Sequence, residues 1–241
     1  MQFILLNTIK YGDKAFVLQV YSREEGRISL FLRGVGRNSN YRAWMHKLSI
    51  MEAEMVERSN GMPVIKEMRP VRELLSIRSS VIKGGIALFM SELVLKGIRE
   101  VEASREMFDF LVRGINLLEE CREGVANFPI YFLTHFCRVA GFAPTDNYSP
   151  QHHRFSPLLG RFVEEDSRFV ERDRMGSPLF EHEASLLLHL LLQLPAEELH
   201  TLPFDREVRY RLAGGLLEYL SLHLGTPVEL KSLDILHQLG N

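Results

Sequence analysis

The spacing of the apolar residues changes once in this sequence, near Ile77, and this change constrains the fold more than any other feature. Up to about residue 75 the apolar residues alternate in short runs, for example over 15–21, and turn residues separate the runs. Beyond that point they recur every three to four residues, for example over 108–118. The sequence therefore predicts a multidomain α+β chain, in which a β-domain precedes a helical one.

The N-terminal part contains four clearly delimited strands. We expect them at 15–21, 27–33, 49–57 and 62–68, with a turn at Ser22–Gly26 and a hairpin signal at Ser59-Asn60-Gly61. The segment Asn38–Lys47 is expected to be a polar, basic loop. Short strands at regular spacing with no helix between them predict a small antiparallel barrel over residues 1–77.

The rest of the chain is expected to be a helical bundle, formed by 78–144 and 180–241. Its first helix should bury a stripe of five residues, which are Ile82, Ile86, Phe89, Leu93 and Ile98. Later helices are expected at 181–194, 205–224 and 231–238. Residues 145–179 form a loop-like insertion, in which Arg161-Phe162-Val163 and Arg168-Phe169-Val170 could pair as a small hairpin.

The strand Arg27–Arg33 carries the most informative surface pattern. Alternation places Ile28, Leu30 and Leu32 on one face, and Arg27, Ser29, Phe31 and Arg33 on the other. If the first set faces a core, the second presents an aromatic ring between two guanidinium groups. Such a row can hold phosphates while a base stacks at its centre. The alternative is a solvated strand face whose Phe packs under a neighbouring loop.

The charge is unevenly distributed along the chain. The formal net charge is −2, but residues 1–78 carry 13 Lys and Arg against 8 Asp and Glu. The remaining residues carry 16 against 23. A basic N-terminal module could therefore attract phosphates, beside an acidic helical body.

No motif for covalent chemistry or metal binding stands out, so we expect neither an enzyme nor a cofactor. His182-Glu183 begins like the zinc-protease H-E-x-x-H, but position 186 is Leu and His189 is out of register. His152-His153 has only Asp146 and Glu164-Glu165 as company, so a solvated loop is expected there. Cys121 and Cys137 are the only cysteines, and we expect both to be buried thiols in helical surroundings.

The chain shows no sign of export or membrane insertion. Its N-terminus lacks the basic region and the cleavage site of a signal peptide. No run approaches the roughly 18 apolar residues that span a bilayer. We therefore expect a cytoplasmic protein that does not bind membranes.

Several short motifs, in order along the whole chain, resemble those of the bacterial recombination mediator family RecO. In the N-terminal part they are Tyr11-Gly12-Asp13, Tyr21–Arg27 and the basic segment Phe31–Arg37. In the helical part they are Leu88–Leu93, Phe108–Leu111, Gly141–Pro144, Tyr219–Leu224 and Lys231-Ser232-Leu233.

This resemblance implies an OB-type barrel, a helical bundle and a small insertion that binds zinc through four cysteines in many members. The insertion here contains no cysteine, so we expect no zinc function. The implied activity is DNA binding, annealing of complementary single strands, and loading of recombinase onto DNA coated by single-strand binding protein. The implied partners are single- and double-stranded DNA, RecR and the C-terminal tail of single-strand binding protein, in a nucleoid-associated protein.

Two sets of site residues follow from the pattern and the resemblance together. The nucleic-acid contacts are expected to come from basic and aromatic residues of the barrel, namely Lys14, Arg23, Arg27, Phe31, Arg33, Arg37, Tyr41, Arg42 and Trp44. The tail of single-strand binding protein is expected to meet cations of the helical body, namely Lys83, Lys96, Arg99, Arg206, Arg209 and Arg211. Alternatively, these cations pair with acids of the same chain.

Two other functions remain open from the residues alone. An OB-type barrel with this composition could bind RNA, or it could be an adaptor that contacts protein and has no DNA activity.

Overall fold

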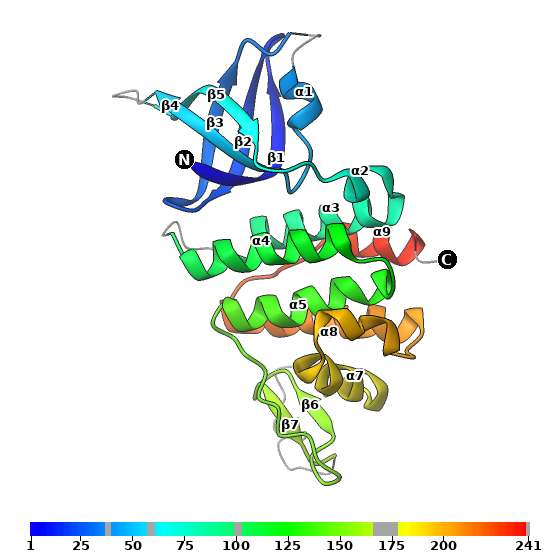
Figure 1. Cartoon of the computed structure of the whole chain (residues 1–241). Helices are drawn as coiled ribbons and strands as arrows, with labels where there is room; N and C mark the ends of the chain where they lie inside the picture. The colour runs from blue at the N-terminus through cyan, green and yellow to red at the C-terminus, as the bar shows by residue number, and fades with distance from the viewer. Residues whose placement is uncertain (37–39, 57–60, 99–102, 166–177, 240–241) are drawn as a thin grey trace. The chain divides into compact units, whose positions relative to one another are not determined.

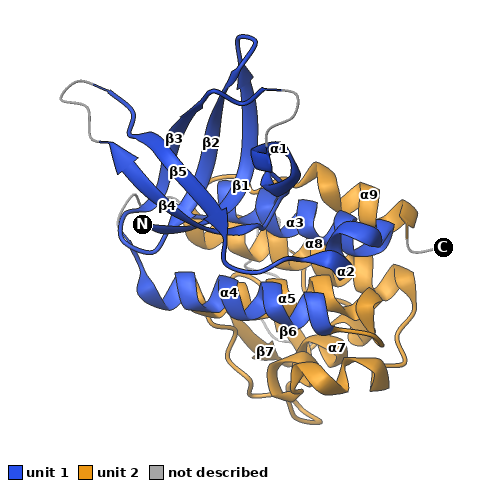
Figure 2. Ribbon diagram, turned by 45° about the horizontal axis from the view of Figure 1, so that its top comes forward, with its two compact units in different colours: residues 1–120 blue, residues 121–241 orange. Residues whose placement is uncertain are grey.

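The computed structural model describes residues 1–36, 40–56, 61–98, 103–165 and 178–239. The chain divides into two compact units, residues 1–120 and 121–241, which are coloured separately in Figure 2.

Unit 1 begins with a closed five-stranded barrel (Figure 1). Its strands are β1 (Gln2–Tyr11), β2 (Ala15–Ser22), β3 (Gly26–Arg33), β4 (Ile50–Val56) and β5 (Val64–Pro70). They are joined in the order β1-β2-β3-β5-β4, and β4 pairs with β1 to close the ring. The predicted barrel is confirmed, but it is mixed rather than antiparallel, because Phe31 and Leu32 of β3 run parallel to Val64 and Ile65 of β5.

The inner side chains of the strands form one apolar core. The cluster consists of Phe3, Leu5, Leu18, Val20, Leu30, Leu32, Val35, Met51, Ala53, Ile65 and Met68. The strand β1 is not among those that the alternating pattern predicted. Ile4 and Leu6, whose side chains alternate with those of Phe3 and Leu5, are also fully buried, and α3 contacts β1. Because the first half of β1 is covered on both faces, Phe3–Leu6 is a continuous apolar run without alternation.

Three helices complete unit 1 after the barrel, namely α2 (Leu75–Ser79), α3 (Val81–Gly97) and α4 (Arg105–Glu120). Ile86, Phe89 and Leu93 of α3 are buried as predicted, whereas Ile82 is 44% exposed and lies outside the buried stripe. The buried face of α3 therefore begins about one turn later than the stripe that we predicted.

The predicted loop at Asn38–Lys47 contains a short helix, α1 (Asn40–Trp44). Its aromatic residues pack against the barrel core, which explains why a segment of polar composition is helical there. Arg37, the predicted phosphate contact just before this segment, lies outside the described residues.

Unit 2 is mainly helical and carries a small hairpin. Its elements are the 3-10 helices η1 (Val125–Asn127) and η2 (Ala196–Thr201), the helices α5 (Phe128–Val139), α7 (His182–Gln193), α8 (Arg206–Leu224) and α9 (Lys231–Leu239), and the strands β6 (Arg154–Ser156) and β7 (Arg161–Val163). The predicted helices at 181–194, 205–224 and 231–238 are confirmed to within a residue. Asp205 caps α8, because its carboxylate accepts a hydrogen bond from the Val208 N–H at 2.9 Å.

The hairpin of the insertion is built differently from the prediction. Arg161–Val163 pairs with Arg154–Ser156, in an antiparallel register. The proposed partner run, Arg168–Val170, lies outside the described residues. Phe155 and Phe162, opposite each other in this register, meet edge to face at 5.3 Å. Burial of these two rings selects the pairing.

The two cysteines differ in burial. Cys137 is fully buried within α5, as predicted, and this burial raises the pKa of its thiol to about 12. Cys121 follows the last residue of α4 and is only partly buried, so the prediction of a buried helical thiol is wrong for this residue. No helix among the described residues has the length and apolarity to cross a membrane.

A single carboxylate holds the short helix α2 in unit 1. Glu119 of α4 accepts hydrogen bonds from the backbone N–H groups of Ser76 and Ile77 at 2.7 and 2.9 Å. These two donors open α2, where a helix leaves its N–H groups without intrahelical partners.

We predict that Glu119→Ala lowers the free energy of unfolding by about 1–3 kcal/mol, because two partly buried donors lose their acceptor. The matched control is Glu120→Ala, which removes an exposed carboxylate whose partner is Arg72 at 3.4 Å. It should change stability by less than about 0.5 kcal/mol. Urea unfolding monitored by circular dichroism measures both, and equal effects would contradict the role of Glu119.

Candidate nucleic-acid interface

The alternation predicted for β3 is confirmed. Leu30 and Leu32 are buried in the barrel core and Ile28 packs against it. Arg27, Ser29, Phe31 and Arg33 lie on the outer face, opposite Tyr21, Gln19, Val17 and Ala15 of β2. In OB-type barrels the face of strands 2 and 3, together with the loop between strands 1 and 2, binds oligonucleotides.

At one end of this face the arginines are tied to helices of the same unit. Arg27 donates through Nη1 to the backbone carbonyl of Leu95 at 2.5 Å. Arg23 lies 3.5 Å from the Asp109 carboxylate, and its guanidinium stands 5.7 Å from the centre of the Phe108 ring. Both guanidinium groups therefore already have partners within unit 1.

At the other end of this face, aromatic and basic side chains contact one another at the surface. The Phe31 ring lies edge to face with Tyr11 at 5.6 Å, and the Arg33 guanidinium stands 5.1 Å from the centre of the Phe31 ring. Tyr11 is 64% exposed. Ile9, two positions earlier on the same face of β1, is 47% exposed. We call Ile9, Tyr11, Phe31 and Arg33 the β1–β3 patch.

Ile9 and Tyr11 are the members of this patch that sequence reasoning missed. Ile9 and Tyr11 alternate with exposed polar residues, so the second half of β1 does show a two-residue period. The apolar run at Phe3–Leu6 hid this signal. Arg33 completes the patch, and among the described residues no acid forms an ion pair with it.

The residues of α1 form a second group, which faces the barrel core. Tyr41 and Trp44 lie 5.7 Å apart and both pack against the core cluster. Arg42 stands over the Phe16 ring at 5.8 Å and donates through Nε to the Gly36 carbonyl at 3.2 Å. The contacts of Tyr41 and Trp44 favour a packing role over base stacking.

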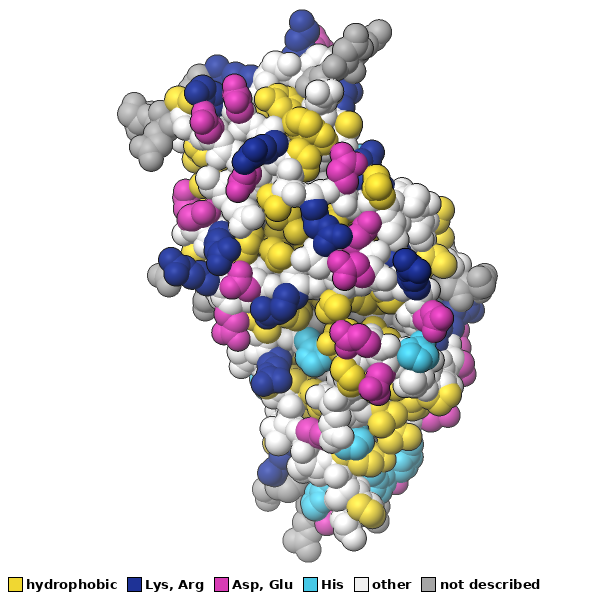
Figure 3. All heavy atoms as spheres, viewed as in Figure 1, with side chains coloured by type: hydrophobic (Ala, Val, Ile, Leu, Met, Phe, Trp, Pro, Cys, Tyr) yellow, Lys and Arg dark blue, Asp and Glu magenta, His cyan; other side chains and the backbone are white. Residues whose placement is uncertain are grey.

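On the face shown in Figure 3, the basic residues of the barrel do not form a continuous field. Lys and Arg side chains there are interspersed with Asp and Glu. Lys14 is exposed in the turn between β1 and β2, beside the patch. Lys47 has a partner within the unit, since its Nζ donates a hydrogen bond to the Leu6 carbonyl at 3.1 Å. Burial also lowers the pKa of its amino group.

The cations expected to receive a partner tail have contacts within their own unit. Lys83 is buried and donates to Ser76 Oγ at 2.7 Å and to the Glu119 carbonyl at 3.0 Å. Lys96 pairs with Glu92 at 2.9 Å. Arg99 lies outside the described residues.

The three arginines of α8 are also engaged. Arg206 pairs with Glu207 at 3.5 Å, and Arg211 lies 3.3 Å from Glu181. Arg209 donates to the Phe204 carbonyl at 2.5 Å, and burial lowers the pKa of its guanidinium. These contacts favour the alternative in which the cations pair within the chain.

A third group, outside the barrel, could hold a metal. His153, Glu165 and His182 place one ligand atom each within 4.8 Å of one another. Sequence reasoning counted only acids near His153, and it considered His182 only as the start of H-E-x-x-H. The hairpin and α7 bring these residues together, and no local pattern encodes that contact.

A closed five-stranded barrel in this strand order, with Tyr11 and Phe31 in contact on its outer face, has the architecture of the OB class of folds. The comparisons with known proteins then identify the family. Residues 1–74 match the family model "Recombination protein O N terminal", and residues 78–234 match "Recombination protein O C terminal".

Relatives of similar length agree. The DNA repair protein RecO of Azobacteroides pseudotrichonymphae is 28% identical over 97% of this chain and 95% of its own length. Those of Phocaeicola vulgatus and Bacteroides fragilis are 30% and 31% identical, over 98% of this chain and 96% of theirs. The chain belongs to the RecO family of DNA repair and recombination proteins, which are not enzymes.

We predict different effects for the two outer arginines of β3. Arg33→Ala should weaken binding of single-stranded DNA and reduce the slope of log affinity against log salt by about 0.7, since one phosphate contact is lost. Arg27→Ala should leave the slope unchanged and lower stability, since Arg27 bonds to Leu95. Fluorescence anisotropy over a salt series, with thermal melts, measures both. An identical slope in the wild type and in Arg33→Ala would exclude Arg33 as a phosphate contact.

Proposed function

We propose that this chain is a DNA-binding recombination mediator. It anneals complementary single strands and helps to load recombinase onto DNA coated by single-strand binding protein, in recombinational DNA repair. Family membership supports the general role, and the β1–β3 patch is the observation that supports single-strand binding by the barrel.

The chemistry of the patch suits annealing. Phe31 and Tyr11 offer rings on which bases can stack, and every base has a face for stacking whatever its sequence. Arg33 and Lys14 offer cations to the phosphates beside those bases. A base held by its face keeps its Watson–Crick edge free, so a complementary strand can pair with it while it remains bound.

We also propose RecR, double-stranded DNA and the C-terminal tail of single-strand binding protein as partners, in the cytoplasm and at the nucleoid. Of the candidate cations that the structure describes, Lys96 and Arg211 are the most accessible, at 40% and 45% exposure of their side chains. Arg211 is paired with the exposed carboxylates of Glu181 and Glu183, and Lys96 with the partly buried carboxylate of Glu92. A peptide carboxylate could replace either partner set.

One groove in unit 2 is less suited to that tail. It has a volume of about 600 Å³ and is lined by apolar residues of α8 and of the segment before α9, including Leu217, Leu222 and Val228. Glu218 and Glu229 also line it. Their charge opposes the acidic tail, so Lys96 and Arg211 are the better targets for mutation.

We predict that Phe31→Ala and Tyr11→Ala each weaken single-stranded DNA binding by about 1–3 kcal/mol and slow annealing, because a stacking surface is lost. The assay anneals complementary oligonucleotides coated by single-strand binding protein. The control is Arg69→Ala, which removes an exposed arginine of β5 that pairs with Glu52.

Two binding assays with the wild-type protein test the two alternative functions, an RNA-binding module and a protein adaptor. Preference for RNA in competition with matched single-stranded DNA would favour an RNA-binding module. Absence of any DNA mobility shift at low salt would favour a protein adaptor. Either result would reject the proposed function.

We predict that Lys96→Glu or Arg211→Glu weakens binding of a labelled tail peptide by at least tenfold, because a cation for its carboxylate becomes an anion. Arg69→Glu is the matched reversal on the barrel and should bind like the wild type. If both helix variants also bind like the wild type, docking through these cations is wrong.

A further inference from the structure

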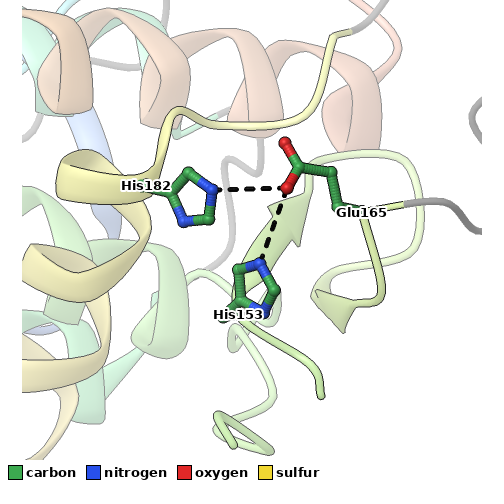
Figure 4. A group of neighbouring side chains, drawn as sticks. All are labelled: His153, Glu165 and His182. Atoms are coloured by element: carbon green, nitrogen blue, oxygen red, sulfur yellow. Dashed lines mark ion pairs between the residues drawn. The ribbon is translucent and has the colours of Figure 1, made fainter. Parts of the chain in front are cut away.

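Three side chains from separate segments of unit 2 converge beside the hairpin (Figure 4). His153 immediately precedes β6, Glu165 follows β7 by two positions, and His182 is the first residue of α7. Nε2 of His182 lies 3.4 Å from Oε2 of Glu165, and Nε2 of His153 lies 3.8 Å from the same oxygen. The two imidazole rings are stacked, with centroids 4.7 Å apart.

The packing of the hairpin on α7 fixes this convergence. The Phe155 N–H donates to Ser185 Oγ at 3.0 Å, and the Phe180 N–H donates to the Phe155 carbonyl at 2.9 Å. The Phe155 ring also packs against Phe180, at 5.0 Å between centroids. The segments that carry His153 and His182 are therefore held in place by buried contacts, although the two histidines themselves remain accessible.

The neighbours of the three side chains leave their ligand atoms available. Nδ1 of His153 lies 3.1 Å from the Pro150 carbonyl, to which it donates, and in the neutral ring this leaves the lone pair on Nε2, which faces Glu165. Metal-binding histidines characteristically donate their other ring N–H in this way. Arg154 binds Oε1 of Glu165 and is itself anchored to the Phe180 carbonyl at 2.6 Å. Oε2 is the oxygen that faces both imidazoles.

The two distances from the carboxylate oxygen of Glu165 to the imidazoles fit a small ion. Two ligands at about 2.1 Å from one tetrahedral ion lie about 3.4 Å apart. The pair formed by Glu165 and His182 already has this separation, and the pair formed by Glu165 and His153 exceeds it by a few tenths of an ångström. Two imidazoles and one carboxylate suit first-row transition metals, whereas Mg²⁺ and Ca²⁺ prefer oxygen ligands alone.

We propose that His153, Glu165 and His182 bind one divalent transition-metal ion, with zinc as the expected ion and water completing its coordination. The ion ties the β6–β7 hairpin to the start of α7 and has a structural role. This site differs from the four-cysteine set implied by the resemblance, and it revises our expectation that the insertion binds no metal. The competing interpretation is a set of ion pairs in which protonated histidines face Glu165.

The test uses the full chain, without a polyhistidine tag and stripped of metal by a chelator. Zinc chloride is titrated in competition with a chromogenic chelator, and thermal melts are recorded with and without zinc. We expect one equivalent to bind, and the melting temperature to rise with zinc. His182→Gln and Glu165→Gln should each weaken zinc binding at least tenfold and abolish that rise.

The matched control is His200→Gln, which alters an exposed histidine of η2 in the same unit and should behave like the wild type. Melts of the metal-free variants verify that they fold, which is expected because the altered side chains are more than half exposed. The proposal is overturned if the wild type binds no stoichiometric zinc. It is equally overturned if His182→Gln and Glu165→Gln bind zinc as tightly as the wild type.

Discussion

Closure of the five-stranded barrel is the constraint on which the N-terminal unit depends. The parallel pairing of β3 with β5 and the antiparallel pairing of β1 with β4 leave no open edge in this sheet. Since apolar side chains fill the interior, binding chemistry has to lie on the outer surface or in the loops. The helix α3 contacts β1, where Ile4 and Leu6 are buried. The far end of β1, with Tyr11 and Ile9, remains exposed.

This arrangement gives different roles to two arginines that lie on the same face of β3. Arg27 and Arg33 stand on the same face of the same strand, six residues apart. Arg27 bonds to the end of α3, and Arg33 lies over the Phe31 ring with its charge open to solvent. A guanidinium that already satisfies a backbone carbonyl loses that bond if it turns to a phosphate, whereas an exposed one loses little. The number of basic residues in a barrel is therefore a poor guide to its phosphate contacts.

The insertion of unit 2 relies on burial in place of cysteines. Phe162, Phe180 and Tyr219 of α8 pack around Phe155, and these rings hold a short hairpin whose strands are only three residues long. A hairpin of this length is marginal alone, so its aromatic anchor is essential to its shape. The same anchor brings His153 beside His182. A structural metal at that point would add to the packing, which already forms the hairpin.

The sequence by itself determined the faces and the ends of most elements. Alternation predicted that Leu30 and Leu32 face inward, and helical spacing predicted a helix over 205–224, because both signals are local in the chain. Only the tertiary structure decided which residues from different elements meet. Tyr11 lies against Phe31, Glu119 caps α2, and Glu165 lies between two histidines 29 positions apart. The physical reason is that periodicity fixes the direction of a side chain, whereas its neighbours depend on how elements distant in sequence pack together.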